Sequence, residues 1–147
     1  MSLFNKPFFS PQEAEAIQQS IVEAERLSSG EIRVHIDRNC KGNVLDKAQA
    51  VFTKLGMQST QLRNGVLIYL VPKQKLMAII GDVGIHEKVG QDFWDNIYLQ
   101  MKTDFAKEQY CEGLQTAVLS VGKALQTHFP IQDNDQNELS NTISYGD

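Results

Sequence analysis

The residues best able to do chemistry flank two apolar runs that are close together in the chain. Asn64-Gly65 precedes the run at positions 66–71, and Gly81-Asp82 follows the run at positions 76–80. A short polar turn at positions 72–75 joins the runs, and this pattern predicts an antiparallel hairpin of buried strands. Because the outer ends of a hairpin lie side by side, we expect Asn64 and Asp82 to be neighbours at one edge of a sheet.

Glu31 belongs to the same predicted edge. It begins the alternating segment 31–37, and a helical pattern separates that segment from the run at 66–71. Strand, helix and strand in this order predict a parallel pair, whose strands both start at the edge that holds Asn64 and Asp82. Two carboxylates and an amide carbonyl suit a hard cation, so Glu31, Asn64 and Asp82 are the predicted metal ligands. Ca²⁺ is the first candidate and Mg²⁺ the second, and three side-chain oxygens predict weak binding.

The same residues also fit ordinary turn chemistry, and this alternative stays open. Asn64-Gly65 would then form a turn, Asp82 would cap the turn at Val83-Gly84, and Glu31 would be a solvated strand end. The edge also lies opposite the carboxyl ends of the parallel strands, where α/β proteins usually bind ligands. No nucleophile motif occurs in the chain, so catalytic residues remain unassigned and any hydrolysis would depend on metal-activated water.

The elements that must position these residues follow from caps and periodicity. Ser10 and Asn43 are predicted helix caps, and further helices are expected from about Gln91 and over 109–128, where Pro130 ends the last one. The fold class is therefore α/β: a compact layered α/β/α sandwich with a small mixed sheet. A parallel strand–helix–strand unit and a hairpin build that sheet, and helices cover both of its faces.

Charge divides the 147 residues into two parts. Residues 130–147 hold four of the 18 acidic residues and no Lys or Arg, which leaves 14 acids against 14 bases in the domain at 1–129. We expect the acidic tail to be disordered. A neutral body argues against nucleic acid as a partner, and the short apolar runs argue against direct membrane insertion. Two separate cysteines and no signal peptide predict a cytoplasmic protein.

Three segments carry a resemblance to a known family. Ser29-Gly30-Glu31-Ile32-Arg33-Val34, the run from Thr60 through Arg63-Asn64-Gly65 to Ile68, and Ala78-Ile79-Ile80-Gly81-Asp82-x-Gly84-Ile85 resemble the TPM domain, over about residues 10–129. The resemblance is to the short soluble bacterial form. It implies an α/β sandwich and, as in some members, Ca²⁺ binding and acid phosphatase activity. Relatives often carry an acid where this chain has Asn64, which implies a weaker metal site here.

Two functions are therefore expected, from different classes. The first is a divalent-cation-binding TPM-domain protein with weak metal-assisted phosphatase activity. The alternative is a non-catalytic interaction module that recruits a protein partner through its sheet edge or its acidic tail. Substitution of Asp82 by Asn would abolish cation binding in the first case and leave it nearly unchanged in the second.

Overall fold

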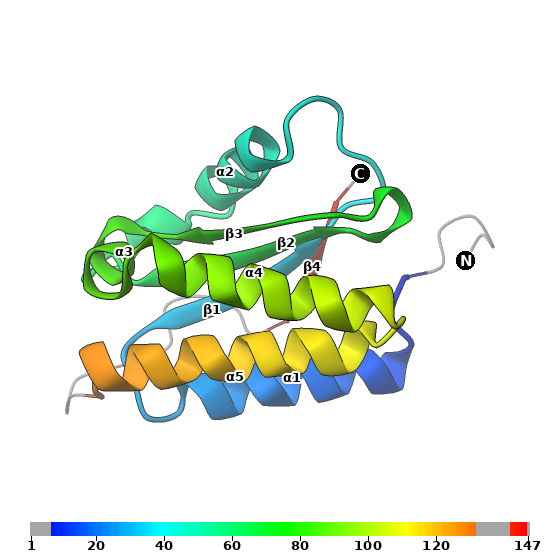
Figure 1. The fold of residues 1–147 in the computed structure, drawn as a ribbon. Helices are drawn as coiled ribbons and strands as arrows, with labels where there is room; N and C mark the ends of the chain where they lie inside the picture. Colours follow the sequence, from blue (N-terminus) through cyan, green and yellow to red (C-terminus); the bar gives the residue numbers. More distant parts are fainter. Residues whose placement is uncertain (1–6, 132–141, 147) are drawn as a thin grey trace.

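The computed structural model describes residues 7–131 and 142–146, and Figure 1 shows their arrangement. The helices are α1 (Pro11–Glu25), α2 (Val44–Lys54), α3 (Val83–Val89), α4 (Gln91–Ala106) and α5 (Tyr110–His128), with short 3-10 turns η2 (Met57–Ser59) and η3 (Pro72–Gln74). The strands are β1 (Glu31–Ile36), β2 (Gly65–Val71), β3 (Leu76–Gly81) and β4 (Ser144–Tyr145).

The strands form one mixed sheet in the order β3-β2-β1-β4. β1 pairs in parallel with β2, and β2 pairs antiparallel with β3, as the strand–helix–strand unit and the hairpin predict. Helix α2 covers one face of the sheet, and α1, α4 and α5 cover the other (Figure 1). The expected layered α/β/α fold is thus confirmed.

Strand β2 is buried along its whole length because it lies between two strands and two helical layers. Its alternate residues enter two different cores. Val66, Ile68 and Leu70 pack with the α1–α4–α5 layer. Leu67 and Tyr69 pack with the α2 layer. In β1, Ile32, Val34 and Ile36 join the first cluster, whereas no residue of this strand belongs to the second. The sheet separates the two apolar clusters.

The tail departs from the expectation of disorder where the structure describes it. Ser144 and Tyr145 form β4, which pairs in parallel with His35 and Ile36 of β1, and Ile143 beside them is only 6% exposed. A single buried isoleucine and two ladder positions anchor this segment, a pattern too short to stand out in a polar sequence. The expectation of disorder for positions 132–141 lies outside the described residues.

Candidate functional site

The structure brings Glu31, Asn64 and Asp82 to one edge of the sheet. Glu31 lies opposite Gly65 in the parallel pair, and its backbone N–H donates to the carbonyl oxygen of Asn64 at 3.4 Å. The backbone N–H of Asp82 donates to the carbonyl oxygen of Gly65 at 2.9 Å. These contacts follow from the parallel unit and the hairpin sharing β2.

All three side chains are buried. Glu31 and Asn64 are each 1% exposed, and Asp82 is 5% exposed. The reading of Glu31 as a solvated strand end is therefore wrong. Carboxylates are rarely buried to this extent without a partner that balances their charge. The question for each residue is which group provides that balance.

For Asp82 the balancing group is Arg63. The guanidinium donates from Nε to Oδ2 at 2.7 Å and from Nη2 to Oδ1 at 2.8 Å, and the pairing raises the pKa of Arg63. Asp82 is also the N-cap of α3, because Oδ1 accepts the backbone N–H of Val83 at 2.8 Å. Both carboxylate oxygens are thus engaged. The cap is the role that the turn-chemistry alternative gives to Asp82, whereas the pair with Arg63 was not expected.

For Glu31 the neighbouring group is a second acid, Glu25. Glu25 is the last residue of α1 and is 4% exposed, and its Oε2 accepts the backbone N–H of Ile32 at 2.7 Å. Its carboxyl group also interacts with that of Glu31. Burial, reinforced by the negative charge of Glu31, raises the pKa of Glu25 to about 8. At neutral pH Glu25 therefore holds a proton beside Glu31.

Sequence reasoning missed Glu25, although a signal for it exists. Glu25 follows Ile17 and Ile21 at successive helical turns and so falls within the apolar stripe of α1. An acid within an apolar stripe predicts either a buried partner for its carboxyl group or a pKa raised by burial. Periodicity alone does not identify Glu31 as that partner, because the turn after α1 brings the two together.

Asn64 completes the arrangement with an oxygen that lacks a protein partner. Its Nδ2 donates to Oγ of Ser29 at 3.4 Å, and its backbone N–H donates to Oγ1 of Thr60 at 3.3 Å. Over residues 7–131 and 142–146, nothing donates to its buried Oδ1. A buried carbonyl oxygen without a donor is costly, so this atom suits a cation or a bound water.

The arrangement fits an oxygen-binding cation only in part. In the described portion of the chain, no three His, Cys, Asp or Glu side chains form a group suited to a metal ion. The edge instead offers the carboxyls of Glu25 and Glu31 and the amide oxygen of Asn64. Asp82 could contribute only by releasing Arg63.

The comparisons with known proteins decide the family. The family model for the TPM domain matches residues 5–124, which is most of the chain. The chain belongs to the TPM domain family. No curated protein matches it.

Solved structures agree with this assignment. The NMR structure of the BA42 protein from the psychrophilic bacterium Bizionia argentinensis is 39% identical, with a TM-score of 0.90, and the match covers 97% of this chain and 98% of that one. The N-terminal domain of cg2496 from Corynebacterium glutamicum (16% identity, TM-score 0.63, coverage 85% and 87%) shares the fold. So does an N-terminal domain from P. gingivalis (22%, 0.67, coverage 82% and 78%).

A second polar cluster in this TPM domain lies on the α2 side of the sheet. His35 Nδ1 is 2.7 Å from Oγ of Ser144, and its Nε2 is 2.8 Å from Oδ1 of Asp37, whose Oδ2 accepts the Tyr69 hydroxyl at 2.5 Å. Burial lowers the pKa of His35, although the interaction with Asp37 opposes the change. The cluster therefore bonds β4 to β1.

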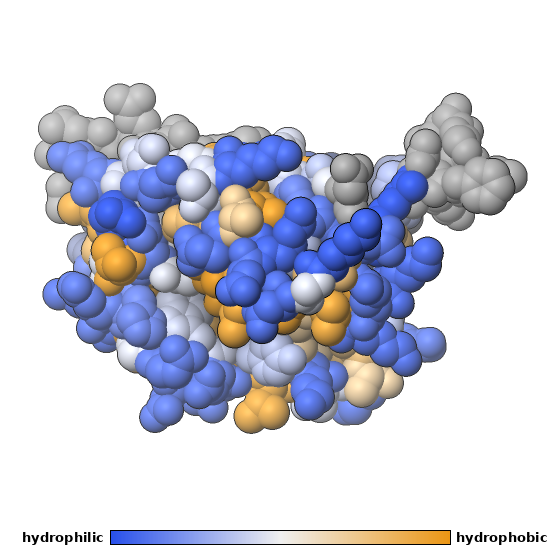
Figure 2. Space-filling model, turned by 90° about the horizontal axis from the view of Figure 1, so that it is seen from above, coloured by the Kyte–Doolittle hydropathy of each residue, from blue (hydrophilic) through white to orange (hydrophobic). Residues whose placement is uncertain are grey.

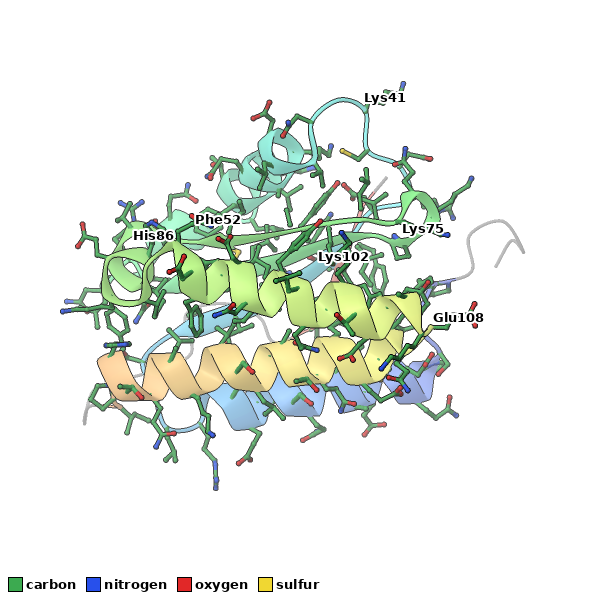
Figure 3. All side chains as sticks on the ribbon, in the orientation of Figure 1. Lys41, Phe52, Lys75, His86, Lys102 and Glu108 are labelled. Carbon is green, nitrogen blue, oxygen red and sulfur yellow. The ribbon has the colours of Figure 1, made fainter. Side chains whose placement is uncertain are left out.

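The amino edge of this TPM domain is closed by α3. His86 lies on that helix (Figure 3), and its Nδ1 accepts a hydrogen bond from Trp94 Nε1 at 3.0 Å. The indole ring leaves no room for a side chain at Gly81, since a Cβ there would lie 2.3 Å from a Trp94 ring carbon.

Among the described helices, none has the length and apolar character needed to cross a membrane.

Proposed function

We propose that this TPM domain binds a divalent cation, Ca²⁺ ahead of Mg²⁺, at the amino edge of its sheet. Glu31 and Asn64 are two of the three ligands that the sequence predicts, the third being Asp82, and Glu25 joins them as a second carboxyl. The proposal is supported by the buried Glu25–Glu31 pair and by the undonated Oδ1 of Asn64, which belong to the same edge of the sheet. A bound cation would account for both features, because it would balance the negative charge of the carboxyls and be coordinated by the amide oxygen.

The raised pKa of Glu25 supports this choice of ligand. Two carboxyls in one buried place cannot both ionise unless a positive charge joins them, and a proton is the minimal solution. A cation that replaces this proton would release it to solvent, so its affinity depends on pH. Oxygen-only ligands favour Ca²⁺ or Mg²⁺ over Zn²⁺, and the small number of protein oxygens favours weak binding.

Asp82 takes a different place in the proposal. Its carboxylate is already balanced by Arg63 and by the N-terminus of α3. A cation would have to displace an arginine that binds through two hydrogen bonds. Asp82 therefore stays a predicted ligand whose contribution depends on release of Arg63. Comparing Asp82→Asn with Glu25→Gln separates the two ligand sets.

The test is a titration of Ca²⁺ and Mg²⁺ into metal-stripped full-length protein, followed by backbone amide NMR. Saturable shifts should centre on Glu25, Glu31 and Asn64, and Glu31→Gln should abolish them. Glu87→Gln is the matched control, because Glu87 is exposed on α3 at the same end of the molecule. Shifts that persist in Glu31→Gln, or that lie only in the acidic tail, would contradict the proposal.

The pH dependence of binding gives a second readout. Because Glu25 must lose its proton, affinity should improve by up to about tenfold per pH unit below its pKa and level off above about 8. Glu25→Gln should flatten this dependence. Asp82→Asn should leave the slope unchanged if Arg63 keeps Asp82, and should abolish binding if Asp82 is a direct ligand.

Weak phosphomonoesterase activity is the catalytic extension of this proposal. A divalent cation would supply charge stabilisation to a phosphate oxygen. Glu31 and Asn64 are almost fully buried, however, which favours a cation that holds the edge over one that meets a substrate. Turnover of p-nitrophenyl phosphate should therefore be slow, and should fall with Glu31→Gln but not with Glu87→Gln. Equal turnover in both variants would separate the activity from the cation site.

The non-catalytic interaction module remains the second candidate, and the Arg63–Asp82 pair favours it. That pair gives Asp82 a purely structural task at the start of α3. The face over α2 is mainly hydrophilic, with scattered hydrophobic side chains (Figure 2), so a partner on that face would be recognised by polar contacts. Absence of any site-specific shift with Ca²⁺ or Mg²⁺ would make this candidate the better account.

A further inference from the structure

The opposite edge of the sheet holds an apolar pocket. Its volume is about 450 Å³, and it lies between the β2–β3 connection and the junction of α4 with α5. Leu70, Leu76 and Met77 line it from the sheet, and Phe105 and Tyr110 line it from the helices. A largely apolar concavity of this size is typical of a small-molecule site.

Three aromatic rings from separate segments build one wall of the pocket. Phe8 and Tyr110 meet edge to face with ring centroids 5.1 Å apart, and Phe105 lies 5.1 Å from Tyr110 at an angle of 40°. Phe8 precedes α1, Phe105 is near the end of α4, and Tyr110 begins α5. Rings that fix one another in this way form a wall before any ligand binds.

The pocket occupies the edge where α/β sheets usually hold ligands. Leu70 and Pro72 mark the carboxyl end of β2, and β1 runs parallel to it and ends at the same edge. Ligands of open α/β sheets bind beyond the carboxyl ends of their parallel strands. This location is the full length of the sheet away from Glu31 and Asn64.

The rim of the pocket carries more positive than negative charge. Lys75 and Lys102 are exposed and line the opening, together with one acid, Glu108. Figure 3 shows Lys75 at the β2–β3 connection and the other two residues on and just after α4. Within the described parts of the chain, neither lysine forms an ion pair. Among the described residues, no acid therefore competes with an incoming anion for either ammonium group.

The position of Lys75 is fixed by the backbone. Lys75 has a left-handed conformation with φ of 57°, and its N–H donates to the carbonyl oxygen of Pro72 at 3.0 Å. The side chain therefore starts from one defined point on the rim. A cation on a side chain that starts from this point, at the rim of an apolar cavity, favours a ligand with an anionic head and an apolar body.

We propose that this pocket binds a small amphipathic carboxylate, represented by a medium-chain fatty acid such as decanoate. The alkyl chain would lie on Leu70, Met77 and the aromatic wall, and the carboxylate would meet Lys75 and Lys102. Apolar burial supplies most of the affinity, because ion pairs at an exposed rim contribute little. The lysines would instead set the orientation of the ligand and the preference for its charge.

The test is an NMR titration of full-length protein with octanoate, decanoate and decyltrimethylammonium, each kept below the concentration at which it forms micelles. Decanoate should shift the side-chain signals of Leu70, Met77, Phe105 and Tyr110 saturably. It should bind more tightly than octanoate, by roughly fourfold for each added CH₂ that the pocket accommodates. The cationic analogue should bind more weakly than decanoate.

Matched lysine variants show which rim lysines interact with the carboxylate of the ligand. Lys75→Gln and Lys102→Gln should each weaken decanoate binding severalfold, whereas Lys73→Gln and Lys107→Gln should not, because these exposed neighbours do not line the pocket. The double variant Lys75→Gln/Lys102→Gln should bind decanoate more weakly than either single variant, should still bind through the apolar wall, and should lose the preference for decanoate over the cationic analogue.

Three results would overturn the proposal: no saturable shift, shifts outside the pocket, or equal binding of the cationic analogue to the wild-type protein. None of them bears on the cation site, because Glu31→Gln should leave decanoate binding intact.

Discussion

Arg63 and Asp82 are joined by two hydrogen bonds, of 2.7 and 2.8 Å, although they lie 19 residues apart in the chain. Arg63 has a left-handed backbone with φ of 51°, and its carbonyl oxygen accepts the N–H of Gly84 at 2.8 Å. Side chain and backbone of one residue thus hold both the cap and the first turn of α3. This junction fixes the amino edge of the sheet.

Two substitutions of Asp82 should separate the contribution of its helix cap to stability from that of its ion pair with Arg63. Asp82→Ala loses the acceptor for Val83 and the ion pair, and should lower the free energy of unfolding by about 2 kcal/mol. Asp82→Asn keeps an acceptor and should cost about half as much. Urea denaturation of both variants measures the difference. Equal losses would mean that the ion pair carries the whole effect.

Gly84→Ala should be among the most damaging small substitutions in the chain. A Cβ at this position would lie 2.2 Å from the carbonyl oxygen of Leu62 and 2.6 Å from that of Arg63, and both are backbone atoms. The strain should cost about 2 kcal/mol or more of unfolding free energy. Val83→Ala is the control, since Val83 is 54% exposed and should change stability by less than about 0.5 kcal/mol. A neutral Gly84→Ala would show that α3 can shift away from the 62–63 turn.

Stability should fall with rising pH because of Glu25. Its pKa is about 8 in the folded protein against an ordinary value of 4.5, so the folded state keeps a proton that the unfolded chain releases. The contribution is complete below pH 4.5 and is lost as pH rises through 8. The glutamine in Glu25→Gln cannot ionise, so the variant should be more stable than the wild type at pH 9. At pH 5 the two proteins should differ little in stability. Denaturation midpoints at both values check this, with the exposed Glu15→Gln as control.

His35 should act in the opposite direction. Its folded-state pKa lies below the ordinary 6.5, so its contribution is complete above pH 6.5 and is lost as pH falls through the folded value. Arg33 and Lys47 add to the lowering by burial, and Asp37 opposes it. Side-chain NMR should give a pKa below 6.5. A value above 6.5 would mean that Asp37 outweighs burial.

The effect of His35 should be concentrated at β4. Because Nε2 donates to the Asp37 carboxylate, neutral His35 has a bare Nδ1, 2.7 Å from Oγ of Ser144, and protonation removes that acceptor. Amide exchange at 144–146, corrected for its intrinsic pH dependence, should therefore accelerate below pH 6.5. Ser144→Ala should raise exchange there at neutral pH and leave β3 unaffected. Uniform acceleration over the whole sheet would instead indicate global unfolding.

Much of the fold follows from local patterns. The apolar runs at 66–71 and 76–80 predict the hairpin because their length and turn are self-contained, and Ser10 predicts the start of α1 through its capping box with Glu13. The meeting of Asn64 and Asp82 follows from the same hairpin. Register is a property of neighbouring segments, so it can be derived from a single sequence.

What could not be predicted depends on contacts between distant segments. The partner of Asp82 is Arg63, and its left-handed backbone has no signal in a residue type that rarely adopts it. The carboxyl of Glu25 meets Glu31 only because the turn after α1 folds back onto β1. Ser144 meets His35 across 109 residues, which no local periodicity records.

Strand β4 also covers the edge of β1 and so prevents other molecules of the protein from pairing with it. Its two residues occupy the free side of β1, beside His35 and Ile36, and the N–H of Gly146 donates to the carbonyl oxygen of Ile36 at 2.9 Å. Without these residues, the unpaired groups of β1 would form an open edge on which a strand of another molecule could add. A chain ended at residue 131 should therefore associate with itself at concentrations where the full chain is monodisperse, and the last few residues act as a guard against aggregation.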